Sequence, residues 1–100
     1  MKETAILINS SRGPIVEPKA LYQALSTGRI AGAGLDVTDP EPILPDDPLL
    51  SLENAIIVPH IGSASVATRT KMAVMAAQNL IAGLRGEPLP NPVNPEVTSS

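Results

Sequence analysis

Three short apolar segments, each closed by polar residues, most strongly limit what this chain can fold into. They are AILI at 5–8, RIAGAGLDV at 29–37 and NAIIVPH at 54–60. All three predict strands, and the uninterrupted AILI run is typical of a strand buried on both faces of a sheet. The glycines of the second segment predict a place where a neighbouring backbone or a ligand approaches closely.

Two segments with helical spacing separate and follow these strands. The first predicts a helix over residues 18–27 that Gly28 ends. The second predicts a longer helix from a cap at Ser63 or Ser65 to about Arg85. The apolar stripe of the long helix consists of Met72, Ala73, Ala76, Leu80 and Leu84.

The order strand, helix, strand, loop, strand, helix indicates an α/β fold with a parallel sheet and right-handed crossovers. A doubly wound domain usually has about six strands, so we expect the C-terminal half of a Rossmann-like sheet, cut from something longer. Residues 1–86 are expected to form this half. The proline-rich residues 87–100 are expected to form an extended arm that lies against another surface, and residues 38–53 a stiff, irregular loop.

Composition argues against several classes of protein. Hydrophobic residues make up 43% of the chain and charged residues 17%, which is typical of a globular protein and not of a disordered one. The chain has no cysteine, so it has no disulfide or thiolate metal site, and we expect a cytoplasmic location. A net charge of -3 without a basic cluster argues against nucleic acid as a partner, and no apolar run is long enough to predict a membrane span.

Polar residues follow all three predicted strands. They occupy residues 9–13, 36–41 and 60–63. In open α/β sheets, ligands bind at the carboxyl ends of the strands, so Arg12, Glu41 and His60 are expected to meet at one edge. Taken singly, each of the three is more often an ordinary turn or loop residue. Their convergence favours a functional site.

An arginine, an acid and a histidine together suit the reduction of a 2-oxo acid. The planar guanidinium binds a carboxylate through two hydrogen bonds. Histidine delivers a proton near neutral pH, and an adjacent carboxylate orients the ring and favours its charged form. When hydride adds to a carbonyl carbon, the oxygen becomes an alkoxide that needs such a proton donor.

Other chemistries fit the chain less well. A single histidine with no cysteine, and acids separated by prolines, gives no recognised spacing of metal ligands. Gly32 and Gly34 do not begin a G-x-G-x-x-G turn, because Val37 stands where the third glycine is needed. No serine has the G-x-S-x-G context of a serine hydrolase.

Several motifs resemble the D-isomer-specific 2-hydroxyacid dehydrogenase family, and most of all its glyoxylate reductase/hydroxypyruvate reductase branch. They are ILINSSRGPIVEPKALYQALSTGRIAGAGLDVTDPEP, PLLSLENAIIVPHIGSAS and NLIAGLRGEPLPNPV. The resemblance covers about residues 3–93, and it is specific because separately spaced motifs agree in order. It implies the C-terminal part of a Rossmann cofactor domain.

The resemblance also implies residue roles. The catalytic residues of the family fall on Arg12, Glu41 and His60. Contacts with the cofactor are implied for Ser10, Ser11, Arg12, Asp36 and Gly62. Contacts with the substrate are implied for Arg12, Asp36, His60, Ile61, Gly62 and Ser63.

The implied reaction is reduction of glyoxylate or hydroxypyruvate to a D-2-hydroxy acid with NADPH or NADH, in a full-length homodimer. Such enzymes also carry a G-x-G-x-x-G turn and a separate substrate domain, and neither is found in these 100 residues. The turn would bind the pyrophosphate and the second domain would exclude water. We therefore expect the missing N-terminal part to be a partner of this chain, and the chain alone to be inactive.

Three alternatives stay open. D-3-phosphoglycerate dehydrogenase, in the same family, has a closely similar arrangement of arginine, acid and histidine. A corepressor branch of the family uses the nucleotide fold chiefly for dimerisation and partner binding. A structural domain that keeps the sheet and binds nothing is the third interpretation.

Overall fold

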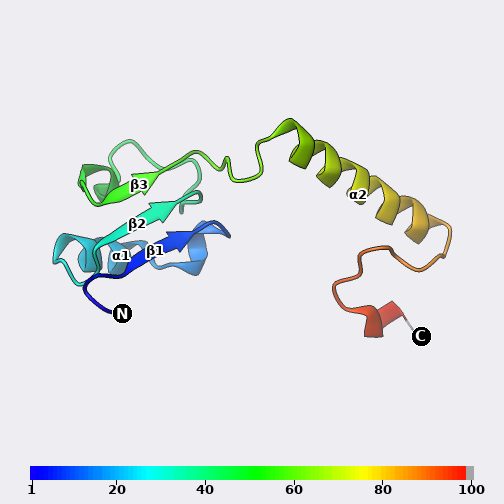
Figure 1. The fold of residues 1–100 in the computed structure, drawn as a ribbon, viewed down its shortest axis with the longest axis horizontal. Helices are drawn as coiled ribbons and strands as arrows, with labels where there is room; N and C mark the ends of the chain where they lie inside the picture. The colour runs from blue at the N-terminus through cyan, green and yellow to red at the C-terminus, as the bar shows by residue number, and fades with distance from the viewer. Residues whose placement is uncertain (99–100) are drawn as a thin grey trace. The chain divides into compact units, whose positions relative to one another are not determined.

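The computed structural model describes residues 1–98. By their internal contacts, the described residues divide into a first unit, Met1–Gly62, and a second unit that begins at Ser63. Figure 1 shows the sheet and helix α1 in the first unit and helix α2 in the second. The expected division into a domain of residues 1–86 and an arm of residues 87–100 stays a prediction.

The first unit is built on a parallel sheet of three strands in the order β1-β2-β3. The strands are β1 (Ile6–Asn9), β2 (Gly32–Leu35) and β3 (Ala55–Ile57). In register, Asn9 of β1 lies opposite Leu35 of β2, so the two strands end together. The α/β class and the parallel sheet expected from the sequence are confirmed.

Helix α1 (Pro18–Ser26) connects β1 to β2, close to the bounds that the sequence predicts. It begins at Glu17, whose carboxylate accepts hydrogen bonds from the backbone amides of Lys19 and Ala20. These bonds satisfy amides that lack partners within the helix. Gly28 follows the helix with a φ of 71°, the left-handed conformation that glycine adopts most readily.

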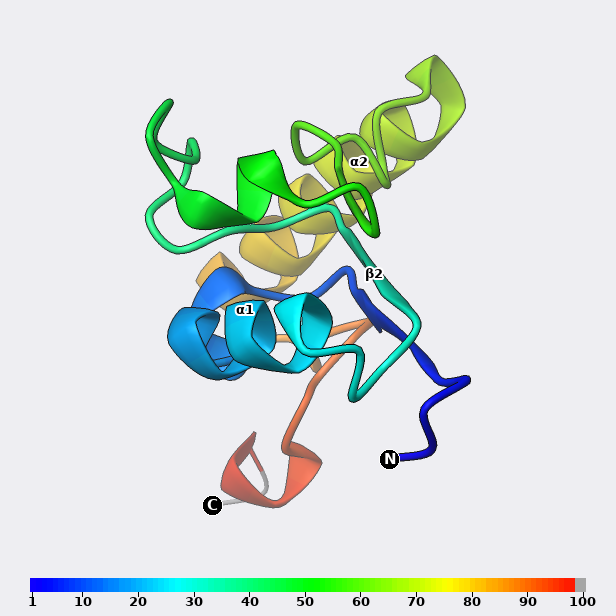
Figure 2. The same cartoon turned by 90° about the vertical axis from the view of Figure 1, so that its left-hand side faces the viewer.

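The core of the first unit lies between α1 and one face of the sheet. Figure 2 shows α1 along one side of β2. The helix contributes Leu21 and Leu25, and β2 contributes Ala33 and Leu35. Leu49, from the short 3-10 helix η2 (Pro48–Ser51), completes the cluster together with Ile30. The loop of residues 38–53 is thus tied into the core and contains a helical turn.

The opposite face of the sheet is exposed. Ile6 and Ile8 of β1 are 65% and 70% exposed, and Ile56 of β3 is 69% exposed. The expectation that β1 is buried on both faces is therefore wrong for the described residues. Successive side chains of a strand point to opposite faces, and α1 covers only one of them.

The glycines of β2 confirm the predicted close approach. A Cβ atom added at Gly34 would lie 2.9 Å from Cδ1 of Ile8. One added at Gly32 would lie 3.1 Å from the carbonyl oxygen of Asn54. The space above β2 is occupied by its neighbours, which explains why this strand carries small residues.

The second unit consists of helix α2 (Val66–Leu84) and the residues that follow it. Of the two predicted caps, Ser65 is the residue used, since its hydroxyl accepts a hydrogen bond from the amide of Thr68. Gly86 follows the helix with a φ of 69°. Within the described residues, no helix is both long and apolar enough to cross a membrane.

The proline-rich arm lies against α2 through a pair of asparagines. The side chain of Asn79 donates to Oδ1 of Asn91, and the Asn91 amide donates to Oδ1 of Asn79. Ala82 is the buried residue of this helix. The arm contains the 3-10 helix η3 (Pro95–Thr98), which the sequence did not predict, and residues 99–100 of the predicted arm lie outside the described residues.

The predicted apolar stripe of α2 is exposed in the structure. Met72, Leu80 and Leu84 are 50%, 63% and 80% exposed. The spacing of the stripe is helical as expected, but within the second unit the arm covers a different side of the helix, around Asn79 and Ala82.

Candidate functional site

The turns that follow β1, β2 and β3 carry Arg12, Glu41 and His60 respectively. Because the strands are parallel, the three turns lie at the same end of the sheet. The sequence predicts this convergence, and the hydrogen bonds of the turns explain how each side chain is held.

His60 and Glu41 form a direct pair. Nδ1 of His60 lies 2.8 Å from Oε2 of Glu41, with the two side chains 41% and 43% exposed. An ionised carboxylate only accepts hydrogen bonds, so Nδ1 is the donor and the ring is held by that nitrogen. Nε2, the other ring nitrogen, is thereby left to face a reacting group.

The surroundings of Glu41 favour its ionised form. Its pKa is lowered from the ordinary value of 4.5, chiefly by the hydrogen bond from His60. Partial burial acts in the opposite direction, while the amide of Thr38 and the charges of His60 and Arg12 add to the lowering. The effect of Arg12 on this carboxylate indicates that its charge lies within electrostatic reach of the pair.

Thr38 stabilises the loop of Glu41 through two hydrogen bonds within that loop. Its amide donates to Oε1 of Glu41 at 3.4 Å, and its hydroxyl donates to the carbonyl of Pro40 at 2.8 Å. Each carboxylate oxygen of Glu41 therefore has its own donor. Thr38 was not predicted from the sequence as part of the site. The available signal was a threonine at the start of a proline-rich turn, where hydroxyls commonly bond to nearby backbone.

The turn that carries Arg12 is organised by Asn9, the last residue of β1. Asn9 is only 6% exposed. Its side-chain amide donates to the carbonyl of Arg12 at 3.0 Å, and its Oδ1 accepts from the amide of Ser11 at 3.1 Å. Asn9 was also not predicted from the sequence as part of the site. Its signal was an asparagine opening the turn NSSRG, which is the pattern of an Asx turn.

Gly13 brings the Arg12 turn against the backbone of the Glu41 loop. The glycine is buried, and a Cβ atom added there would collide with the carbonyl oxygen of Thr38 and lie 2.7 Å from the amide nitrogen of Asp39. Only glycine fits so close an approach. The position of Arg12 therefore depends on the same backbone that positions Glu41.

Asp36, the residue after β2, contacts the turn of His60. Its Oδ1 accepts from the amide of Ile61 at 2.7 Å, and its Oδ2 accepts from the amide of Gly62 at 2.9 Å. Its pKa is lowered from 3.8, first by the hydrogen bond from Ile61, then by that from Gly62 and the charge of His60, with partial burial opposing them. The charged carboxylate is thus the form that fits this place.

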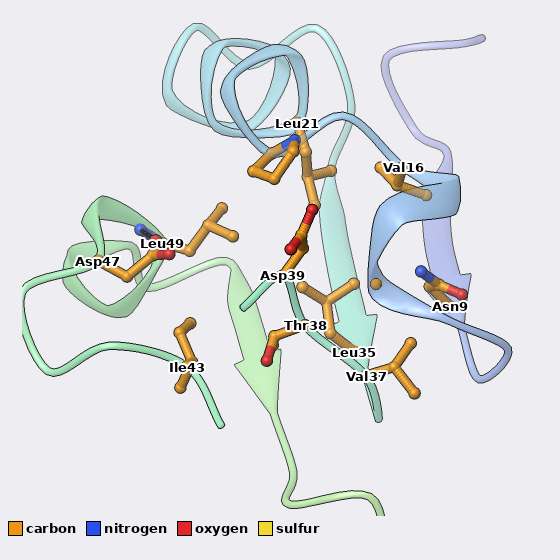
Figure 3. A pocket seen from close by; sticks show the side chains of 12 residues that line it. Asn9, Val16, Leu21, Leu35, Val37, Thr38, Asp39, Ile43, Asp47 and Leu49 are labelled. Atoms are coloured by element: carbon orange, nitrogen blue, oxygen red, sulfur yellow. Dashed lines mark hydrogen bonds between the residues drawn. The ribbon is translucent and has the colours of Figure 1, made fainter. Parts of the chain in front are cut away.

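Two hollows adjoin these turns. The larger, about 340 Å³, lies beside the His60 and Glu41 pair and is otherwise lined mainly by apolar residues, including Ile43, Leu50 and Ile57. The smaller, about 20 Å³, lies among the side chains that Figure 3 shows between α1, η2 and the end of β2. It has room for about one water molecule, so the interior behind the loop is closely packed.

The other predicted site residues occupy two places. Ser10 and Ser11 are exposed on the Arg12 turn, and Arg12 donates from Nη1 to the carbonyl of Ser11 at 2.7 Å. Ile61 and Gly62 follow His60 directly, and Ile61 is 51% exposed. Ser63 belongs to the second unit, where its carbonyl accepts from Nε of Arg69. The ligand contacts expected of these residues stay predictions.

Among residues 1–98, no three histidine, cysteine or acidic side chains are grouped to hold a metal ion. The acids near His60 are engaged otherwise, since Glu41 binds its ring and Asp36 binds backbone amides. The chemistry of this edge is therefore that of a carboxylate-oriented histidine, at the end of the sheet that also carries Arg12.

Comparison with known proteins places this geometry in a family. The family model for "D-isomer specific 2-hydroxyacid dehydrogenase, NAD binding domain" matches residues 1–62. Over 97 residues, the chain is 64% identical to the glyoxylate reductase of Korarchaeum cryptofilum, covering 97% of this chain and 29% of that protein. Over 91 residues, it is 60% identical to the human glyoxylate reductase/hydroxypyruvate reductase, covering 91% of this chain and 28% of that protein.

A solved structure agrees with these sequence matches. The NADPH-dependent glyoxylate/hydroxypyruvate reductase of Sinorhizobium meliloti, in complex with NADP and malonate, matches with a TM-score of 0.81 and 43% identity. The match covers 93% of this chain and 29% of that one. The chain thus spans less than a third of the length of the relatives that it matches. It belongs to the NAD-binding domain family of the D-isomer-specific 2-hydroxyacid dehydrogenases.

Proposed function

We propose that this chain supplies the catalytic edge of an NAD(P)H-dependent reductase that converts glyoxylate or hydroxypyruvate to the corresponding D-2-hydroxy acid. One observation carries the proposal: Nδ1 of His60 is bound to Glu41 at 2.8 Å, at the sheet edge that also carries Arg12. The similarity to a glyoxylate reductase and a glyoxylate reductase/hydroxypyruvate reductase supports this choice of substrate over that of D-3-phosphoglycerate dehydrogenase.

His60 is the proposed proton donor. Its Nδ1 is occupied by Glu41, so Nε2 is the nitrogen that would give its proton to the carbonyl oxygen of the substrate. Glu41 accepts the hydrogen bond from Nδ1 and thereby fixes the orientation of the ring. A positioned acid of this kind contributes about 10²–10⁴-fold to a rate.

Arg12 is the proposed anchor for the substrate carboxylate. Its guanidinium is permanently charged and offers donors in a planar fork, which fits a carboxylate with two parallel hydrogen bonds. Asn9 and Gly13 hold the turn on which Arg12 lies. Such a turn fixes the backbone of the residue while the exposed side chain reaches the substrate.

The exposed turns also fit the nicotinamide end of a dinucleotide. We propose that Ser10, Ser11 and Arg12 contact it from the first turn, and that Gly62 and Asp36 contact it from the others. The bound cofactor would supply the hydride that adds to C2 of the substrate, and the nicotinamide would be oxidised as His60 protonates the oxygen.

The complete activity is proposed for a longer protein, because these residues include neither a G-x-G-x-x-G turn nor a substrate domain. We propose that residues 1–86 form the C-terminal part of its cofactor domain and residues 87–100 an arm. A homodimer and a cytoplasmic location belong to the same proposal. The chain by itself is expected to show no turnover, since its sequence lacks the G-x-G-x-x-G turn that would bind the pyrophosphate.

A chimera tests the proposal directly. This chain would replace the matching 97 residues of the Korarchaeum cryptofilum glyoxylate reductase, to which it is 64% identical. With the cofactor that the parent enzyme uses, we expect glyoxylate-dependent oxidation of NADH or NADPH within about tenfold of the parent rate, and a fall of about 10²-fold or more in kcat for His60→Gln. The matched control is Gln78→Asn in the exposed surface of α2, which should leave kcat unchanged.

Two results would count against the proposal. One is a folded chimera without activity towards glyoxylate or hydroxypyruvate. The other is an active chimera in which His60→Gln, Glu41→Gln and Arg12→Lys all turn over at the unchanged rate, because the proposed roles require each to matter.

A further inference from the structure

His60 has an unusual backbone conformation. Its φ is 56°, in the left-handed region, and among the described residues it is the one non-glycine with a positive φ. A side chain at such a φ crowds the neighbouring carbonyl, so surrounding contacts must hold the residue there. Because His60 is the proposed proton donor, the contacts that hold it in this conformation bear on its function.

The residues before His60 fix one side of its turn. The amide of Val58 donates to the carbonyl of Leu35 at 2.9 Å, which anchors the end of β3 to β2. The amide of His60 donates to the carbonyl of Val58 at 3.0 Å. These bonds hold the residues before His60, whereas the residues after it need other hydrogen-bond partners.

Asp36 provides that partner. The two amides that follow His60, those of Ile61 and Gly62, point at its two carboxylate oxygens at 2.7 and 2.9 Å. Successive amides with this orientation form a concave site for an anion, and here a carboxylate of the same chain fills it. Gly62 completes the fit, because a Cβ atom added there would lie 2.8 Å from Oδ2 of Asp36.

The backbone of Asp36 is itself held by a hydrogen bond. Its backbone amide donates to the carbonyl of Asn9 at 2.9 Å, at the point where β1 and β2 end. A short side chain on a fixed backbone has little freedom, so the carboxylate holds the His60 turn in place relative to the sheet. The lowered pKa of Asp36 agrees with a charge that is bound by amides.

We propose that Asp36 is a positioning residue, whose carboxylate holds the His60–Gly62 turn in its left-handed conformation and thereby directs the His60 ring at Glu41. This is a different role from the cofactor contact expected of Asp36 from the family resemblance. We call the two hydrogen bonds from the amides of Ile61 and Gly62 to the Asp36 carboxylate the clamp. The clamp is formed by residues of this chain alone. Its consequence for catalysis rests on the function proposed above.

Hydrogen-bond couplings measured by NMR on the unmodified, ¹³C,¹⁵N-labelled chain test the clamp without any substitution. A long-range HNCO experiment detects scalar coupling across a hydrogen bond. We expect cross-peaks from the amide nitrogens of Ile61 and Gly62 to the side-chain carboxyl carbon of Asp36. Spectra with well-resolved correlations for the core residues Leu21 and Leu25, but without either cross-peak, would overturn the proposal.

Asp36→Asn then tests what the clamp does. An amide side chain can accept one of the two bonds but presents its own N–H groups to the other donor. We expect amide hydrogen exchange at Ile61 or Gly62 to become about tenfold faster, as for the loss of one hydrogen bond. The ¹³Cα and ¹³Cβ shifts of His60 should also move away from left-handed values. Asp39→Asn is the matched control, an exposed acid near the same strand end, and it should change neither measurement.

If Asp36→Asn leaves the exchange rates and the His60 shifts as they are in Asp39→Asn, the positioning role is refuted. In the chimera, the positioning role predicts a lower kcat, while the cofactor contact proposed above for Asp36 predicts a separate rise in the KM for the reduced cofactor. An unchanged kcat would count against the positioning role. An inactive chimera would refute the proposed function and leave the NMR results to decide on the clamp.

Discussion

A single backbone hydrogen bond, 2.9 Å long, joins the amide of Asp36 to the carbonyl of Asn9. The two residues lie at the ends of neighbouring strands, and the side chain of each organises a different turn. Asn9 binds the backbone of the Arg12 turn, and Asp36 binds the backbone after His60. The turn of Arg12, the proposed anchor, and the turn of His60, the proposed proton donor, are therefore both held from the same point of the sheet.

Replacement of Asn9 should weaken both the fold and the site. Asn9→Ala removes a donor and an acceptor from a nearly buried position, so the free energy of unfolding should fall by about 1–3 kcal/mol. Urea denaturation of the chain measures this change. Asn91→Ala, at the exposed arm, is the matched control and should have a smaller effect on the first unit.

Stability should fall in acid, in part through Glu41. Its pKa is depressed in the folded chain, so its stabilising contribution is present above its ordinary value of 4.5 and is lost as the pH falls through the lowered value. Glu41→Gln should therefore flatten the dependence of the unfolding free energy on pH below about 4.5. Asp46→Asn, at an exposed acid of the same loop, is the matched control, and equal curves for the two variants would contradict the prediction.

Arg12 should not be replaceable by lysine. Arg12→Lys keeps the charge but loses the planar fork, so in the chimera we expect kcat/KM for glyoxylate to fall by about 10²-fold. Steady-state kinetics with varied glyoxylate would measure the effect. Arg29→Lys, at an exposed position after α1, should have no effect. Equal kcat/KM for the two variants would remove the case for a bidentate contact.

Gly13 should be intolerant of any side chain. Gly13→Ala would drive a methyl group into the carbonyl oxygen of Thr38, and overpacking of this kind costs about 1–3 kcal/mol. Gly83→Ala gives the opposite expectation. Its added Cβ would lie at an ordinary 3.4 Å from Leu89, and alanine favours the helical backbone by about 0.5–1 kcal/mol. Thermal unfolding followed by circular dichroism should show the two effects with opposite signs.

The core of the first unit should depend on the leucines of α1. Leu25 is 3% exposed, and Leu25→Ala should cost about 2–5 kcal/mol through lost burial and a new cavity. Leu50 is 48% exposed, so Leu50→Ala should cost much less. Similar losses for both variants in urea denaturation would mean that the cluster around Leu25 is not the stabilising core.

The sequence was sufficient to predict the order of elements and the residues that meet at the strand ends. Alternation of apolar runs with a helical pattern is a local signal, and parallel strands bring their carboxyl ends together without further information. The pairing of Glu41 with His60 followed from that topology. Capping chemistry predicted Ser63 or Ser65 as the start of the long helix, and the structure shows that Ser65 is the cap.

The sequence was less informative about which surfaces are covered. The apolar run that includes Ile6 and Ile8 has the same sequence pattern whether one or both faces of its strand are packed. In the structure, the face that carries these two side chains is exposed. The stripe that includes Leu80 shows the same ambiguity, since spacing identifies a face of a helix without identifying what lies on it.

The roles of Asn9, Thr38 and Asp36 could not be assigned by residue type alone. Each acts through hydrogen bonds to backbone groups, and those depend on the path of the turns. Asp36 shows this most clearly, because its partners Ile61 and Gly62 lie in a turn that follows a different strand. Such a contact is visible only when both turns are in place.

The hydrogen bonds that hold the turns of Arg12, Glu41 and His60, from the side chain of Asn9 to the amide of Gly62, join residues of one uninterrupted stretch of chain. A genetic recombination event that moved this stretch would carry the histidine, its carboxylate and both organising side chains together. The hydrogen bonds among them would be inherited as a set. Diversification of such proteins can therefore proceed by exchange of the segments around this stretch while the proton-transfer pair is passed on intact.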